Sequence, residues 1–140
     1  MKFYLAARYS RHEELRGYAD QLEHHGHVVT SRWISGEHEA LDSELLSPIN
    51  RRLAEKFFQD DMEDILAADA LIAFTEASDS GFSRGGRHVE FGIALVAGLR
   101  LFVVGPWENL FYLAPRVRHY RSFDELYLEL CIPRDVAAAG

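Results

Sequence analysis

Residues 70–105 read ALIAFTEASDSGFSRGGRHVEFGIALVAGLRLFVVG, and this stretch indicates the fold class. Two short apolar runs, at 70–75 and 101–105, have the length and character of buried strands. Between them, residues 87–97 have the apolar content of a helix that ends at Gly98. Strands that alternate with helices predict a parallel sheet, because each helix returns the chain to the same end of the sheet.

The same alternation extends in both directions along the chain. In chain order, the further elements expected are a strand at 2–7, a helix from Ser10 to Gly26, a strand at 28–33, a helix at 51–68, a strand at 117–121 and a helix that begins at Ser122. Both serines are followed three residues later by glutamate, the spacing of a capping box.

These elements predict one α/β domain over residues 1–140, with a mostly parallel sheet of about five strands. Helices should cover both faces of that sheet, which makes a three-layer sandwich. We expect 34–50 to be a loop or the irregular start of the next helix, and 106–116 to be irregular. The tail at 133–140 should be frayed.

Composition narrows the class of protein. The 140 residues suit one core, and the formal net charge of −7 argues against a nucleic-acid binder, which would need a basic face. Cys131 is the single cysteine, so no internal disulfide can form. The start of the chain has no signal-peptide pattern, and no apolar run is long enough to span a bilayer. We therefore expect a cytoplasmic protein with neither a membrane nor a nucleic-acid polymer as partner.

In an open parallel sheet the ligand binds at the carboxyl ends of the strands. That rule selects the segments Ala7–Ser10, Glu76–Gly86 and Pro106–Asn109. The second segment ends in SRGGR (83–87), in which glycines allow close backbone approach and a helix N-terminus follows. Ser83, Arg84 and Arg87 add donors suited to a phosphate. The alternative, that the glycines only form a turn and the arginines are solvated, is equally consistent with these five residues.

Three further side chains stand out by their positions. Glu90 lies in the first turns of an apolar helix, where it could act on a substrate or simply complement the helix dipole. Asp61 lies between Phe57 and Ile65 on one helix face, so it should border a cavity or pair with an arginine. Tyr4 lies in the first strand, as a core tyrosine or as a residue that orients a carboxylate.

Four segments together resemble the nucleoside 2-deoxyribosyltransferase family, which includes the 2'-deoxynucleoside 5'-phosphate N-hydrolases. They are FYLAARYS (3–10), QDDMEDILAADALIAF (59–74), GGRHVEFGIALVAGLRLFVV (85–104) and PWENLF (106–111). The resemblance implies a small flavodoxin-like α/β sandwich, assembled as a homodimer or a larger homo-oligomer. It also implies that Glu90 is the nucleophile, that Asp61 supports it and that Tyr4 holds it in place. Asn109 would complete the site of a neighbouring subunit.

The loop between the third strand and Glu90 departs from the typical transferases, because it is longer and more basic. It is similar to the phosphate-holding segment of the nucleotide hydrolases, whereas Asp79 is the only candidate for a transferase acid there. We therefore expect cleavage of the N-glycosidic bond of a (deoxy)nucleoside 5'-monophosphate or nucleoside. The alternatives are a deoxyribosyltransferase that acts on free deoxynucleosides and, in another class, a non-catalytic nucleotide-binding sensor.

The substrate-binding residues predicted on this basis come from the three strand ends. They are Ala6, Arg8, Tyr9, Ser10, Asp79, Ser83, Arg84, Gly85, Gly86, Arg87 and Asn109. No cofactor and no metal is expected, since the histidines of HHGH (24–27) form a polar helix end without a nearby cysteine. Trp33 could stack on a base or pack in the core, and Phe111 and Tyr112 are candidates for contact with a partner subunit.

Overall fold

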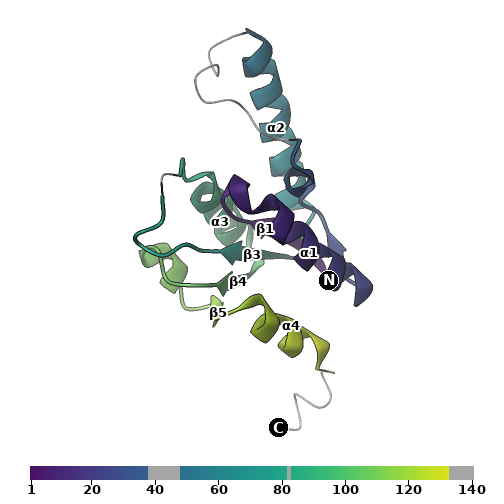
Figure 1. Ribbon diagram of the computed structural model, residues 1–140, viewed down its shortest axis with the longest axis vertical. Coiled ribbons are helices and arrows are strands. Elements are labelled where there is room, and N and C mark those ends of the chain that lie inside the picture. The colour runs from purple at the N-terminus through teal and green to yellow at the C-terminus, as the bar shows by residue number, and fades with distance from the viewer. Residues whose placement is uncertain (38–47, 82, 133–140) are drawn as a thin grey trace.

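The computed structural model describes residues 1–37, 48–81 and 83–132 (Figure 1). Within these residues the strands are β1 Lys2–Ala6, β2 Val28–Val29, β3 Ala70–Phe74, β4 Arg100–Val104 and β5 Arg118–Tyr120. The α-helices are α1 His12–His24, α2 Pro48–Leu66, α3 Gly86–Ala97 and α4 Phe123–Cys131. Short 3-10 turns lie at η1 Tyr9–Arg11, η2 Arg32–Ser35 and η4 Leu110–Leu113.

The strands form one sheet in the order β2-β1-β3-β4-β5, and every neighbouring pair is parallel. This confirms the parallel five-stranded sheet predicted from the sequence. The chain moves outward from β1 to β2 and then crosses back to β3. The carboxyl ends of β1 and β3 therefore flank the point where the strand order reverses, which is where ligands bind in such sheets.

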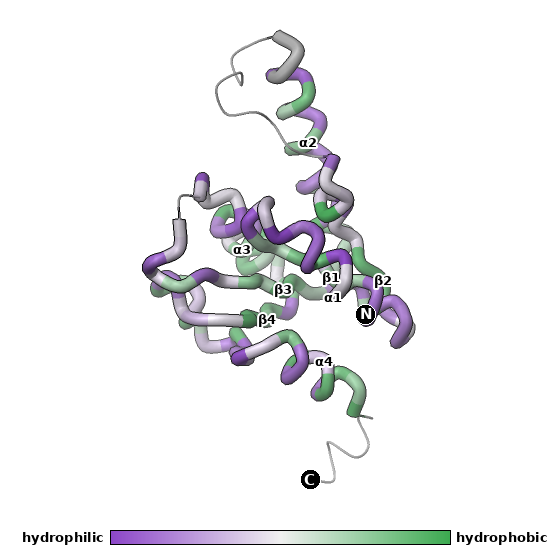
Figure 2. The backbone as a smooth tube through the Cα atoms, in the orientation of Figure 1, coloured by the Kyte–Doolittle hydropathy of each residue, from purple (hydrophilic) through white to green (hydrophobic). Residues whose placement is uncertain are grey.

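Helices cover both faces of the sheet, as predicted (Figure 1). On one face, Tyr18 of α1 stacks on Phe74 of β3 and on Phe123 of α4. On the other face, α3 packs on β1, β3 and β4 and also contacts α2. Because the central strands are buried from both sides, β1 after Lys2 and the whole of β3 are apolar, as the hydropathy colouring in Figure 2 shows.

The second strand is shorter than the predicted range of 28–33. The Ser31 hydroxyl accepts a hydrogen bond from the Leu5 N–H at 2.6 Å, and the Trp33 indole donates to the Leu5 carbonyl at 2.8 Å. These side chains occupy the backbone groups of β1 that a longer β2 would have bonded. The chain is therefore free to turn into η2 at Arg32.

The N-terminus of α1 also differs from the prediction. The turn η1 precedes the helix, Arg11 is the N-cap residue, and no side chain caps the helix. The expected Ser10–Glu13 capping box is therefore wrong. At α4 the prediction is confirmed for Ser122, whose hydroxyl accepts from the Glu125 N–H at 3.2 Å. In place of the reciprocal bond of a capping box, the Glu125 carboxylate accepts from the Arg121 N–H and not from the Ser122 N–H.

Helix α2 begins at Pro48, earlier than expected, and ends at Leu66. Its apolar pattern overstates its contact with the core, since Phe58 and Leu66 are exposed while Ile65 is buried. The N-terminal half of α2 extends beyond the sheet (Figure 1). Asp64 is buried and accepts from the Arg32 N–H at 2.9 Å.

Two sequence predictions lie wholly or partly outside the described residues. They are the frayed tail at 133–140 and, within the expected loop at 34–50, residues 38–47. No helix within the described residues has both the length and the apolar character needed to cross a membrane.

Candidate active site

The three side chains singled out in the sequence come together from three different elements. Tyr4 is fully buried in β1, Glu90 comes from the second turn of α3, and Asp61 comes from α2. Burial, followed by the charges of Glu90 and Asp61, raises the pKa of Tyr4 well above its ordinary value. The Tyr4 hydroxyl, Glu90 Oε2 and Asp61 Oδ1 are all buried atoms. A hydroxyl and two carboxylates thus share one low-dielectric site.

Burial raises the pKa of Glu90 to about 8, and the charge of Asp61 adds to the rise. The Tyr4 hydroxyl lies close enough to offset part of this rise, although it makes no hydrogen bond of ordinary geometry within the described residues. Glu90 Oε2 likewise has no hydrogen bond from the described part of the chain. Glu90 therefore holds its proton at neutral pH, and both groups keep hydrogen-bonding capacity that a substrate could use.

The N-terminus of α3 has the features expected of an anion site. Its N-cap residue is Gly85 at φ 81°, a left-handed conformation that glycine adopts without strain. No side chain caps the helix, and its first turn has no acidic residue. The positive end of the helix dipole therefore remains available at the end of the β3–α3 loop.

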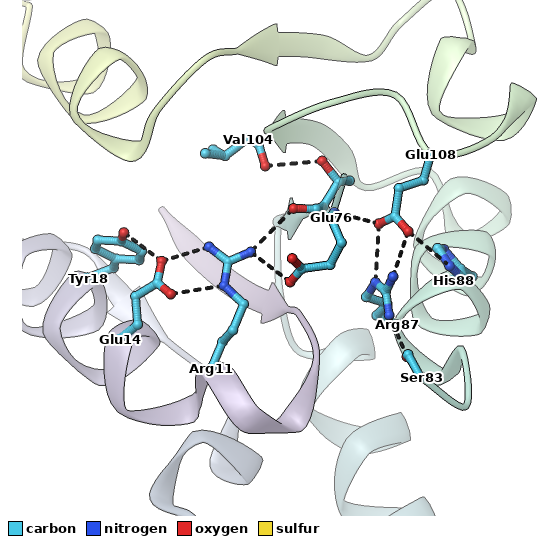
Figure 3. A network of polar contacts seen from close by, with 10 residues as sticks. Arg11, Glu14, Tyr18, Glu76, Ser83, Arg87, His88, Val104 and Glu108 are labelled. Carbon is cyan, nitrogen blue, oxygen red and sulfur yellow. Dashed lines mark hydrogen bonds and ion pairs between the residues drawn. The ribbon is translucent and has the colours of Figure 1, made fainter. Parts of the chain in front are cut away.

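Arg87, predicted as a phosphate ligand, is held inside the protein instead (Figure 3). Its Nη2 lies 2.6 Å from Glu108 Oε2, and its Nη1 donates to the Ser83 hydroxyl at 2.6 Å. The side chains of Arg87 and Glu108 are only 6% and 15% exposed. Arg87 therefore ties the start of α3 to the loop after β4, and its charge is already neutralised.

A second set of contacts joins the ends of β1 and β3 (Figure 3). Arg11 Nη1 donates to the Thr75 carbonyl at 3.3 Å and pairs with Glu76 at 3.2 Å. The Glu76 N–H in turn donates to Glu108 Oε1 at 2.8 Å. These bonds connect the carboxyl ends of β1, β3 and β4, and so they fix the rim of the candidate site.

Sequence reasoning missed Arg11, Glu76 and Glu108 as members of this rim. The available signal was position, since Glu76 and Glu108 each follow a predicted strand within the segments selected for ligand binding. Their partners could not be found from one sequence, because the contacts join residues 21 to 65 positions apart.

The remaining predicted residues divide between the rim and the interior. Ser10, Asp79, Ser83, Arg84 and Gly86 are exposed, whereas Ala6 is fully buried. The guanidinium of Arg8 reaches the β3–α3 loop, where a Cβ placed on Gly81 would lie 3.7 Å from its Nη2. The Tyr9 hydroxyl donates to the Gly36 carbonyl. Of the predicted cations, Arg84 therefore belongs to this loop, and the side chain of Arg8 reaches it from the end of β1.

Four aromatic and amide side chains take roles set by local packing. Trp33 is buried and bonded to Leu5, so the structure supports packing rather than base stacking. Tyr112 is buried against Phe91 and bonds to His88 at 2.7 Å, so it is unavailable to a partner subunit. Phe111 is 62% exposed, and Asn109 Oδ1 accepts from its N–H at 2.9 Å. No group of histidine, cysteine or acidic side chains in the described residues could hold a metal ion.

Sequence comparison with protein-family models and with curated proteins gives no match. Solved structures do match. A 2-deoxyribosyltransferase from the psychrotolerant bacterium Bacillus psychrosaccharolyticus aligns over 91% of this chain and 90% of its own, with a TM-score of 0.63 and 21% identity. The CMP N-glycosidase of Clostridium botulinum aligns over 94% of this chain and all of its own, with a TM-score of 0.58 and 19% identity. The chain therefore has the three-layer α/β fold of a 2-deoxyribosyltransferase and a CMP N-glycosidase, as the resemblance implied.

Proposed function

We propose that the protein cleaves the N-glycosidic bond of a nucleoside or a nucleoside 5'-monophosphate, with Glu90 as the nucleophile. The observation that carries this proposal is the buried cluster of Tyr4, Asp61 and Glu90. It is supported by the fold, because both similar structures are of enzymes whose names specify transfer or cleavage at a sugar–base bond. A purely structural domain gains nothing from two acids buried side by side, since each raises the cost of ionising the other.

The chemistry follows from the charges that develop when the bond breaks. Positive charge builds on C1' and on the ring oxygen, and a carboxylate beside C1' stabilises it or forms an ester with it. The Glu90 carboxylate attacks C1', and the electrons of the C1'–N bond leave with the base, which takes up a proton. In this proposal Asp61 hydrogen-bonds the sugar or base and helps to deliver that proton. Tyr4 orients Glu90.

The intermediate ester then determines the type of reaction. Water attacking C1' releases the free sugar and restores the Glu90 carboxylate, which is hydrolysis. A second base attacking the same carbon gives a new nucleoside, which is transfer. The similarity to the 2-deoxyribosyltransferase favours transfer, and the similarity to the CMP N-glycosidase favours hydrolysis.

A 5'-phosphate would bind at the N-terminus of α3, where the dipole and the loop arginines favour an anion. In the proposal, Arg84 and Arg8 are the cations that bind the phosphate. Arg87 instead maintains the loop through Glu108. This assignment differs from the sequence prediction, in which Arg87 contacted the phosphate directly.

A homo-oligomer is part of the proposal. Leu110, Phe111 and Leu113 form a run of exposed apolar side chains on η4, directly after Asn109. Such a surface favours contact with another subunit. In that arrangement Asn109 would reach the site of the neighbouring copy.

The test is a panel of nucleosides and 5'-monophosphates, incubated with the protein with and without a free acceptor base. Chromatography follows base release and base exchange, and Glu90→Ala is the control. Release from monophosphates without acceptor establishes hydrolysis, and exchange that requires acceptor establishes transfer. If the monophosphate is the substrate, Arg84→Gln should raise KM for it and leave any reaction of the free nucleoside unchanged. Saturable binding without turnover would replace the enzyme proposal with the nucleotide sensor.

A further inference from the structure

A second concentration of positive charge lies at the amino ends of the strands, away from Glu90. A cavity of about 360 Å³ is lined by Arg100, Arg116 and Arg118, together with residues at the start of β4. The chain as a whole has a formal net charge of −7. Three arginines thus line one cavity in a chain whose overall charge is negative.

The contacts of these arginines leave most of that charge uncompensated. Arg116 donates to the Leu99 carbonyl at 2.9 Å and also to the Leu95 carbonyl, so its position is fixed by uncharged carbonyl groups in the last turn of α3 and just after it. Arg118 lies 3.9 Å from Glu129, and their side chains are 64% and 46% exposed. The Arg100 side chain has no hydrogen bond or ion pair with any residue that the structure describes. Within the described residues, Glu129 is thus the only carboxylate that forms an ion pair with any of the three arginines.

We propose that this cavity binds a phosphate group, either as the free ion or as part of a small phosphorylated molecule. Guanidinium groups offer planar pairs of donors that match phosphate oxygens. The volume lies at the lower end of the roughly 300 to 1,000 Å³ that small-molecule sites occupy. Arg116 is preorganised by its carbonyl contacts, so binding does not have to order that side chain.

The site is distinct from the candidate active site. Arg100 begins β4, and the loop that carries Glu108 follows the other end of this five-residue strand. At about 3.3 Å per residue, the two ends of β4 lie roughly 15 Å apart. This proposal therefore does not rest on the proposed N-glycosidase activity.

Arg100→Gln is the most informative variant. Because Arg100 has no acidic partner in the described structure, its replacement leaves no carboxylate uncompensated, and the fold should be retained. Arg16→Gln is the matched control, since Arg16 is an exposed arginine of α1 that lies 3.6 Å from Glu13. Arg84→Gln serves as a second control, because it removes a cation of the candidate active site.

The experiment titrates inorganic phosphate and glycerol phosphate into each protein and follows the backbone amide resonances by NMR. We expect saturable shifts at residues 98–102 and 116–118 in the wild type. Arg100→Gln should weaken binding at these amides about tenfold or more, the loss of one charge-assisted hydrogen bond. Both controls should keep the wild-type affinity at these same amides, whatever Arg84→Gln does to phosphate binding at the N-terminus of α3. Tighter binding of glycerol phosphate would identify a phosphorylated small molecule, and equal or tighter binding of inorganic phosphate would identify the free ion. Shifts that are absent from these amides, or equal affinity in Arg100→Gln, would overturn the proposal.

Discussion

Glu90 is a carboxyl group buried beside a second carboxylate, and both conditions oppose its ionisation. Its pKa of about 8 follows from burial first and from Asp61 second. As a nucleophile, however, Glu90 must be ionised. The ligand-free protein at neutral pH is therefore mostly in the protonated form, and base release should increase as the pH rises towards 8.

The same pKa makes a prediction about stability. Glu90 ionises near 4.5 in an unfolded chain and near 8 in the folded protein, so between these values only the unfolded state loses the proton. The free energy of unfolding should therefore decrease as the pH rises from about 4.5 to 8 and then level off. Glu90→Gln should flatten this decrease and be more stable than wild type above pH 8, as measured by urea denaturation.

Glu13→Gln is a suitable control for that measurement, because the Glu13 side chain is 80% exposed. It should retain the wild-type dependence on pH. A wild-type free energy of unfolding that does not fall across this range would show that Glu90 is not held protonated.

Tyr4→Phe tests the positioning role of the Tyr4 hydroxyl. The ring remains to fill its place in the core, and the hydroxyl has no hydrogen bond of ordinary geometry in the described structure, so stability should change little. Tyr4 lowers the pKa of Glu90, so its loss should move the rising limb of kcat/KM to higher pH. We expect about a tenfold lower kcat at neutral pH. An unshifted pH profile with unchanged kcat would mean that Tyr4 only packs.

At the scale of helices, the two predicted caps provide a matched pair of variants. Ser122 accepts a hydrogen bond from the third residue of α4, whereas Ser10 caps no helix. Ser122→Ala should lower the free energy of unfolding by about 1 kcal/mol, the usual contribution of such a cap. Ser10→Ala should stay within about 0.5 kcal/mol of wild type. Equal losses in thermal or urea denaturation would contradict the assigned helix starts.

The buried pair of Arg87 and Glu108 joins α3 to the loop after β4. It should contribute far more to the free energy of unfolding than the more exposed pair of Arg11 and Glu14. Glu108→Ala leaves the Arg87 charge buried without its partner, which should cost about 3 kcal/mol or more. Glu14→Ala breaks the more exposed ion pair with Arg11, and the loss of that pair should lower the free energy of unfolding by about 1 kcal/mol or less. The variant also loses the hydrogen bond from the Tyr18 hydroxyl, which adds its own small contribution. Urea denaturation of both variants makes the comparison, and similar losses would show that the Arg87 pair is not specially buried.

The elements that sequence reasoning predicted best are those with a strong local signal. Helix α3 was expected from residue 87 to 97 and runs from Gly86 to Ala97, because an apolar helix follows glycines and ends at Gly98. The extent of β2 could not be predicted, since it depends on the distant bonds of Ser31 and Trp33 to Leu5. The exposure of Phe58 could not be predicted either, because apolar periodicity does not encode how much of a helix face is covered by the core.

At the scale of the whole molecule, the parallel topology explains why the candidate site could be anticipated. Parallel strands place the ends of β1, β3 and β4 along one edge, so the loops selected from the sequence had to meet. The convergence of Tyr4, Asp61 and Glu90 needs more than topology, because it depends on α2 and α3 packing on the same face. The resemblance to a family, rather than periodicity, identified these three residues as a group.

The central claim is that Glu90 acts on the sugar, and base release tests it most directly. The initial rate would be measured near pH 8, where Glu90 is substantially ionised, for wild type, Glu90→Gln and the exposed control Glu13→Gln. The account predicts that wild type and Glu13→Gln release base at similar rates, and that Glu90→Gln is slower by roughly a thousandfold or more. Base release by Glu90→Gln within a few-fold of wild type would contradict it.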